Sequence, residues 1–179
     1  MGRLAALREA GVRWYLFGAQ AALVHGAARL TSDVDATVLC DPGDVVALTA
    51  VLAAHGFALR PAPPDFIERT RVVPLAHVRT GMQADVVLGG PGLEEMFASR
   101  AVVRDLDGVP VPVAMAEDLL AMKILAGRPK DLDDVRALLA SNPGRLDLDQ
   151  TRAVLRELEM ALDRRDLLEE LERAIRSLD

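Results

Sequence analysis

The segment YLFGAQAALVHGAARLTSDVDATVL, residues 15–39, carries the strongest structural signal in this chain of 179 residues. It predicts a short apolar strand, a turn at Gly18, a helix over residues 19–28 and a second apolar strand over residues 33–39. Side chains two apart on a strand share a face, so the carboxylates of Asp33 and Asp35 should project together. Such a pair suits a divalent metal ion, and free backbone N–H groups where the helix opens at Gly18 suit an anion.

The Asp-x-Asp spacing by itself is a weak signal, because it recurs at 105/107, 131/133 and 147/149. Only the pair at 33/35 opens an apolar strand, where a charge is costly to bury without a metal ion or a polar partner. Two interpretations stay open for this pair: a metal site, or a surface strand with solvated carboxylates.

A third carboxylate stands in the segment MQADVVL, residues 82–88, where Asp85 is the lone charge in a predicted strand. If this strand lies beside residues 33–39, Asp85 joins the first two carboxylates. Three carboxylates suit two Mg²⁺ ions, with Asp85 as a ligand of the second ion and a proton acceptor. The alternative is an edge-strand aspartate that points to water.

Three further positions combine charge or polarity with a suggestive context. Arg29 and Thr31 precede the carboxylates, where they can bind phosphate or hold the turn. Lys123 lies between apolar residues, so its ammonium group must reach solvent or meet an anion such as a triphosphate. Asp131 and Asp134 lie three apart on the next predicted helix and can orient Lys123. The alternative is an exposed lysine near an ordinary acidic helix start.

The order of predicted elements indicates an α+β fold, with a mixed β-sheet flanked by helices and a helical C-terminal part. Residues 1–113 are expected to form the core, and residues 114–179 the helical part that carries Lys123 and Asp131. A helix is also expected over residues 4–10. Residues 67–73 and 76–79 are expected to be extended, and turns at 80–81 and 107–108 are expected to close two hairpins.

Composition excludes several classes of protein. The net charge of −6 argues against a general nucleic-acid coat. The single cysteine excludes an internal disulfide and argues against a structural zinc site. No apolar run approaches the roughly 20 residues that span a bilayer, so no membrane association and a cytoplasmic location are expected.

Together these segments resemble the nucleotidyltransferase superfamily with the DNA polymerase β-like fold. The nearer resemblance is to AbiEii/MenT-type toxin nucleotidyltransferases and their uncharacterised relatives. The blocks that carry it are Arg29-Leu-Thr-Ser-Asp-Val-Asp35, Lys123-Ile-Leu-Ala126 and Lys130-Asp-Leu-Asp-Asp134. The departure is Ala19, where the family usually has Gly or Ser, which removes a hydroxyl contact but keeps the backbone N–H groups.

The resemblance implies a Mg²⁺-dependent enzyme that moves a nucleoside monophosphate from an NTP, such as ATP, to a hydroxyl and releases pyrophosphate. It implies two bound Mg²⁺ ions held by Asp33, Asp35 and Asp85, nucleotide contacts from Gly18, Ala19, Arg29, Thr31 and Lys123, and catalytic roles for the three carboxylates, Lys123 and Asp131. The expected acceptor is RNA, tRNA especially, or a protein, in a toxin–antitoxin system with a cognate antitoxin. The alternatives are an antibiotic-modifying nucleotidyltransferase and a non-catalytic binding partner or antitoxin with the same fold.

Overall fold

A computed structural model describes residues 11–27, 31 and 33–178 of the chain. The helix expected over residues 4–10 and the site residue Arg29 lie outside the described residues. The described residues divide into two compact units, one of residues 11–20, 31 and 33–114 and one of residues 21–27 and 115–178. Each unit is described by itself below.

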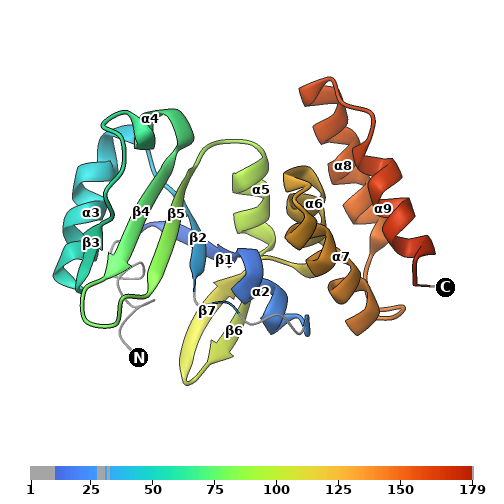
Figure 1. Cartoon of the computed structure of the whole chain (residues 1–179), viewed down its shortest axis with the longest axis horizontal. Helices are drawn as coiled ribbons and strands as arrows, with labels where there is room; N and C mark the ends of the chain where they lie inside the picture. Colours follow the sequence, from blue (N-terminus) through green and yellow to red (C-terminus); the bar gives the residue numbers. More distant parts are fainter. Residues whose placement is uncertain (1–10, 28–30, 32, 179) are drawn as a thin grey trace. The chain divides into compact units, whose positions relative to one another are not determined.

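The first unit is built on a mixed sheet, as the sequence predicted. The strands are β1 (Arg13–Phe17), β2 (Val34–Leu39), β3 (Phe57–Leu59), β4 (Val72–His77), β5 (Gln83–Gly89), β6 (Val102–Leu106) and β7 (Val109–Val113). Among the described residues they form one sheet of seven strands in the order β3-β4-β5-β2-β1-β7-β6 (Figure 1). The β2–β5 and β1–β7 pairs are parallel and the other pairs are antiparallel.

Two helices of this unit lie on opposite faces of the sheet (Figure 1). Helix α3 (Val45–Ala54), which follows the 3-10 turn η1 (Pro42–Asp44), buries Leu48 and Leu52. Helix α5 (Leu93–Arg100) covers the other face, where Gly89 lies against both Thr37 of β2 and Glu94 of α5. Because successive strand residues alternate between faces, Thr37 and Asp35 lie on the α5 side.

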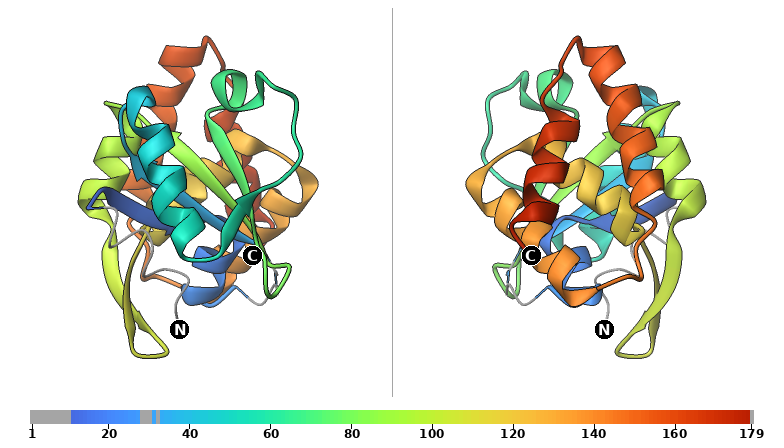
Figure 2. Two further views of the ribbon diagram at one scale, coloured as in Figure 1. Left: turned by 90° about the vertical axis from the view of Figure 1, so that its left-hand side faces the viewer. Right: turned by 90° about the vertical axis from the view of Figure 1, so that its right-hand side faces the viewer.

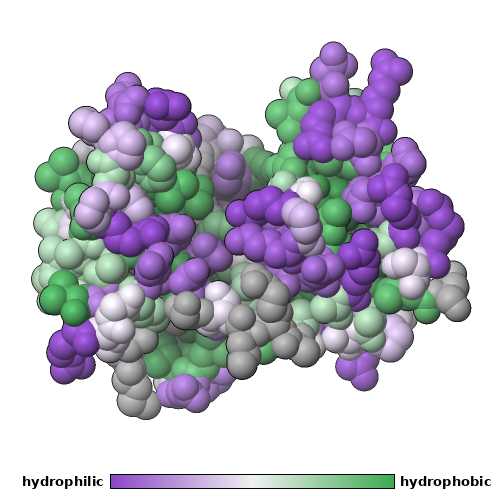
Figure 3. Space-filling model, viewed as in Figure 1, coloured by the Kyte–Doolittle hydropathy of each residue, from purple (hydrophilic) through white to green (hydrophobic). Residues whose placement is uncertain are grey.

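Helix α2 (Gly18–Val24) follows β1, and its residues from Ala21 onward belong to the second unit. The rest of that unit consists of α6 (Ala116–Ala126), α7 (Pro129–Ser141), α8 (Leu148–Leu162) and α9 (Leu167–Arg176). Its core contains Leu119, Leu120, Ile124, Leu138, Leu155 and Leu171, each at most 1% exposed. Helices α8 and α9 pack side by side, as the right-hand view of Figure 2 shows. Hydrophilic side chains gather over these two helices on the face in Figure 3.

Three local expectations from the sequence are wrong. Residues 78–79 form a turn after β4 and are not extended. Residues 67–70 are helical, within α4 (Phe66–Thr70), and not extended. Arg71 ends this helix in the left-handed conformation, with φ of 54°, and β4 begins only at Val72. The helix expected over residues 19–28 is shorter, because α2 ends at Val24. Among the described helices, none combines the length and the apolar character needed to cross a bilayer.

Candidate active site

The structure places Asp35 and Asp85 side by side on neighbouring parallel strands. Asp35 of β2 is the register partner of Asp85 of β5. Residues directly opposite each other in a sheet have Cβ atoms roughly 5 Å apart and point to the same face. Two carboxylates at this spacing repel each other, so the pair favours a cation between or beside them.

Gly18 belongs to the same site through its contact with Asp35. Its φ of +71° is a conformation that only glycine adopts without strain, and a Cβ there would overlap Oδ2 of Asp35. Phe17, the preceding residue, is the register partner of Asp35 across the β1–β2 pair. The glycine turn and the Asp-x-Asp strand are therefore one local arrangement, in which the absent side chain of Gly18 makes room for the carboxylate.

The structure does not gather all of the sequence-predicted residues as closely. Asp33 precedes β2 and is exposed, and its backbone N–H donates to Oγ1 of Thr31 over 3.2 Å. The carbonyl of Thr31 accepts from Nε2 of Gln20 over 2.9 Å, so hydrogen bonds join Thr31 to both Gln20 of α2 and Asp33. Ala19 is 5% exposed. In the part of the chain that the structure describes, no three His, Cys, Asp or Glu side chains are grouped so as to hold a metal ion.

Sequence reasoning did not assign Arg60 to the site. Arg60 forms an ion pair with Asp85, and its Nη1 donates to Oε1 of Gln83 over 2.8 Å. Its backbone N–H donates to the carbonyl of Pro74 over 2.9 Å, which extends the β3–β4 ladder by one residue. Arg60 directly follows β3, and only the strand order shows that this end of β3 lies near Asp85, with β4 between β3 and β5.

The donor set formed by Asp35 and Asp85 fits one hard divalent cation. Mg²⁺ in proteins is usually bound by one or two carboxylates and completes its shell with water and substrate phosphates. Asp35 lies near the start of β2 and Asp85 near the start of β5, where the end of β1 also pairs with β2. These two adjacent carboxylates satisfy the requirement without a third protein ligand.

The second unit contains a buried charge cluster around Lys123. Nζ of Lys123 donates to Oδ1 of Asp131 over 3.3 Å and to Oδ2 of Asp134 over 2.5 Å, and all three side chains are at most 7% exposed. The predicted contact of Asp131 and Asp134 with Lys123 is confirmed, and the alternative of an exposed lysine is wrong. Burial raises the pKa of Asp131, but the hydrogen bond from Arg128 and the charge of Lys123 outweigh it and lower that pKa overall.

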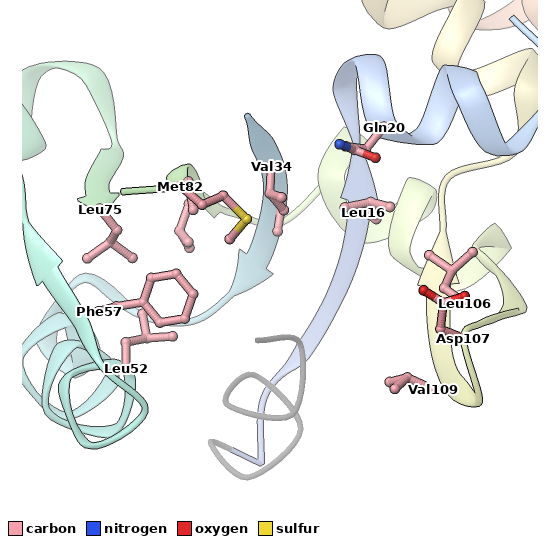
Figure 4. Close-up of a pocket in the computed structure, with 13 residues that line it drawn as sticks. Leu16, Gln20, Val34, Leu52, Phe57, Leu75, Met82, Leu106, Asp107 and Val109 are labelled. Carbon is pink, nitrogen blue, oxygen red and sulfur yellow. The ribbon is translucent and has the colours of Figure 1, made fainter. Parts of the chain in front are cut away.

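A cavity of about 360 Å³ lies on the other face of the sheet (Figure 4). Its lining includes Val34 and Ala36 of β2, which alternate with Asp35 and so face away from the carboxylates. Leu52 of α3 and Phe57 of β3 add to an apolar wall, in which Gln20 and Asp107 are the polar side chains. An apolar cavity of this kind does not suit a triphosphate.

Comparison with solved structures shows the same fold at low sequence identity. The solution structure of the antibiotic-resistance factor ANT(2'')-Ia is 14% identical, with a TM-score of 0.59, and the match covers 90% of this chain and 91% of that chain. A crystal structure of ANT(2'')-Ia with adenylyl-2''-tobramycin is 16% identical, with a TM-score of 0.59 and coverage of 87% and 94%. An antigenic nucleotidyltransferase-like protein from Paracoccidioides brasiliensis is 17% identical, with a TM-score of 0.57 and coverage of 95% and 89%.

No protein of curated function matches the chain in sequence. The family comparison is decisive, because one family described as "Nucleotidyltransferase of unknown function (DUF6036)" matches residues 6–173. This range contains the glycine turn, the paired carboxylates and the buried lysine cluster. The chain belongs to this nucleotidyltransferase family.

Proposed function

We propose that the protein transfers a nucleoside monophosphate from an NTP to a hydroxyl group in a reaction that needs a divalent cation, Mg²⁺ in the cell. The observation that carries the proposal is the register of Asp35 with Asp85, which pairs two carboxylates beside the glycine turn at Gly18. Membership of a nucleotidyltransferase family supports it.

In this reaction Asp35 and Asp85 would hold the cation, and Asp33 would supply a further carboxylate at the open end of β2. The bound cation supplies neutralisation of the triphosphate charge and activation of the attacking oxygen. The acceptor oxygen forms a bond to the α-phosphorus while the bond to the bridging oxygen breaks and pyrophosphate leaves. A carboxylate oxygen of Asp85 accepts the proton of the acceptor hydroxyl.

The nucleotide-binding residues are a further part of the proposal. Gly18 and Ala19 would bind the triphosphate through their backbone N–H groups. Arg29 and Thr31, which precede β2 in the sequence, would add side-chain contacts to it. Lys123 and Asp131 enter through the resemblance in sequence. Their mutual contact gives both a structural role as well, because Lys123 already neutralises two buried carboxylates.

For the acceptor, we propose RNA, tRNA ends especially, or a protein, as in a toxin that a cognate antitoxin restrains. Residues 60–104 contain six arginines and five acidic residues, so this segment is not acidic although the whole chain has a net charge of −6. Its charge is therefore compatible with RNA binding. A second candidate is transfer to an aminoglycoside. The structural likeness to ANT(2'')-Ia, solved with adenylyl-2''-tobramycin, and the acidic chain favour a cationic drug as that acceptor.

The test is a transfer assay with α-labelled NTPs and Mg²⁺, in which total RNA, protein extract, aminoglycosides or no acceptor is added. Label in RNA or protein supports the first candidate, and label on the drug supports the second. Asp35→Asn and Asp85→Asn should each abolish transfer, whereas Asp105→Asn, in the exposed β6–β7 hairpin, should retain it. Absence of transfer to every acceptor would leave the non-catalytic binding partner as the better account.

A further inference from the structure

Arg60 reaches Asp85 across a neighbouring strand. Register partners place Arg60 beside Pro74, Pro74 beside Asp85, and Asp85 beside Asp35, all in one row on one face of the sheet. Pro74 is buried and has a short ring in place of a long side chain. The guanidinium group of Arg60 can therefore pass over it to the carboxylate of Asp85.

The ion pair with Asp85 stabilises this position of the Arg60 side chain. Its Nε is buried and makes no hydrogen bond within the described part of the chain, which is an unfavourable environment for a guanidinium nitrogen. The compensating contacts are the ion pair with Asp85 and the hydrogen bond to Gln83. Without Arg60, the carboxylates of Asp35 and Asp85 would face each other with less neutralising charge.

We propose that Arg60 acts as an internal counter-ion for the metal site: its guanidinium neutralises Asp85 when no metal is bound, and a divalent cation displaces it. The inference rests on the proposed function, since it takes Asp35 and Asp85 as metal ligands. Arg60 is a positioning residue here and contacts no reacting atom. The guanidinium group of Arg60 and the cation compete for the carboxylate of Asp85, so binding of one weakens binding of the other.

This competition has a defined direction. Arg60 stabilises the metal-free protein, and the cation must first break the Arg60–Asp85 ion pair. Loss of Arg60 should therefore weaken the metal-free fold and strengthen metal binding. The opposite role, in which Arg60 holds Asp85 ready for the metal ion, predicts weaker metal binding when Arg60 is removed. The sign of the change in affinity separates the two roles.

The experiment measures Mn²⁺ binding by electron paramagnetic resonance with the full-length protein and no nucleotide. Arg60→Gln should bind Mn²⁺ roughly three- to tenfold more tightly than the wild type, an effect limited by solvent because the Arg60 and Asp85 side chains are 28% and 44% exposed. The matched control is Arg69→Gln, which removes the same charge from an exposed pair with Asp65 on the same unit. It should bind Mn²⁺ as the wild type does.

A second variant and a second readout protect the test against a folding defect. Gln83→Ala removes the exposed anchor of Arg60 and should tighten Mn²⁺ binding in the same direction by a smaller factor. In thermal unfolding with EDTA, the melting temperature of Arg60→Gln should be lower than that of Arg69→Gln. Added Mn²⁺ should reduce the difference between the two melting temperatures.

The outcomes distinguish the inference from the function on which it rests. Unchanged or weaker Mn²⁺ binding by Arg60→Gln and Gln83→Ala, with binding still lost in Asp85→Asn, would overturn the counter-ion role alone. Wild-type Mn²⁺ binding that survives both Asp35→Asn and Asp85→Asn would overturn the proposed metal site and the role of Arg60 together.

Discussion

At the scale of single residues, the site depends on Gly18, which has no side chain. Gly18 has positive φ, and its Cα leaves room for the carboxylate of Asp35. The sequence could predict a turn at Gly18, since it stands between an apolar strand and a helix. The contact with Asp35, 17 residues later, depends on the antiparallel pairing of β1 with β2, which no local pattern specifies.

Replacement of Gly18 by alanine separates backbone strain from steric overlap. Gly81→Ala is the matched control, because Gly81 has φ of +67° and open space around its Cα. We expect each alanine to cost about 1 kcal/mol for its positive φ, and Gly18→Ala about 2 kcal/mol more for overlap with Asp35. Urea unfolding measures both costs. Equal destabilisation of the two variants would contradict the packing of Asp35 against Gly18.

At the scale of elements, strong helical periodicity was predictable and short irregular pieces were not. The helical C-terminal part was predictable because α7, α8 and α9 each have an apolar stripe that faces a core, whereas α6 is buried on nearly all sides. Helix α4 was missed because five residues are too few to show a period, and its apolar start, Phe66-Ile67, also suits a strand. The contacts of Arg60 with Pro74 of β4 and Asp85 of β5 were equally unpredictable, since strand order is a non-local property.

The pairing of α6 with α7 through Lys123 predicts a structural cost on mutation. Lys123→Met would remove the buried ammonium group that pairs with both Asp131 and Asp134, although Arg128 still pairs with Asp131. We expect a loss of about 3 kcal/mol in the free energy of unfolding. Lys130→Met, at an exposed position of α7, is the control and should change stability little. Wild-type stability of Lys123→Met with lost transfer activity would instead assign Lys123 a direct role on the nucleotide.

The same cluster predicts how stability depends on acid. The pKa of Asp131 is lowered in the folded protein, so its ion pairs contribute fully above the unfolded pKa of about 3.9. This contribution is lost as the pH falls through the lowered folded value. Urea midpoints between pH 6 and pH 3 should decrease more steeply for the wild type than for Asp131→Asn. Parallel pH curves for the two proteins would contradict the assignment.

At the scale of the whole molecule, the two units are not consecutive in sequence. Residues 21–27 belong to the helical unit although β2 and the later strands of the first unit follow them in the chain. The contacts explain this assignment: Nδ2 of Asn142 donates to the carbonyl of His25, and Oγ of Ser141 donates to the carbonyl of Gly26, both over 2.9 Å. A boundary drawn from sequence alone follows chain order and cannot anticipate such a return.

A fragment of residues 115–179 tests this division. It lacks these two hydrogen bonds and the buried methyl groups of Ala21, Ala22 and Ala27, each at most 1% exposed. We expect the fragment to be about 4 kcal/mol less stable than the same helices in the full chain. Fusion of residues 18–27 to its N-terminus through a flexible linker should restore part of the loss in a urea titration followed by circular dichroism. An isolated fragment with full stability would show that residues 21–27 contribute nothing to this unit.

The central claim is that Asp35 and Asp85 together hold the catalytic cation. The most direct measurement is anomalous X-ray scattering from crystals of the protein grown with Mn²⁺ and a non-hydrolysable NTP analogue. The account predicts a manganese peak within coordination distance of both carboxylates, with the α-phosphate of the analogue beside it. A well-ordered analogue whose manganese ion lies away from Asp35 and Asp85 would contradict it.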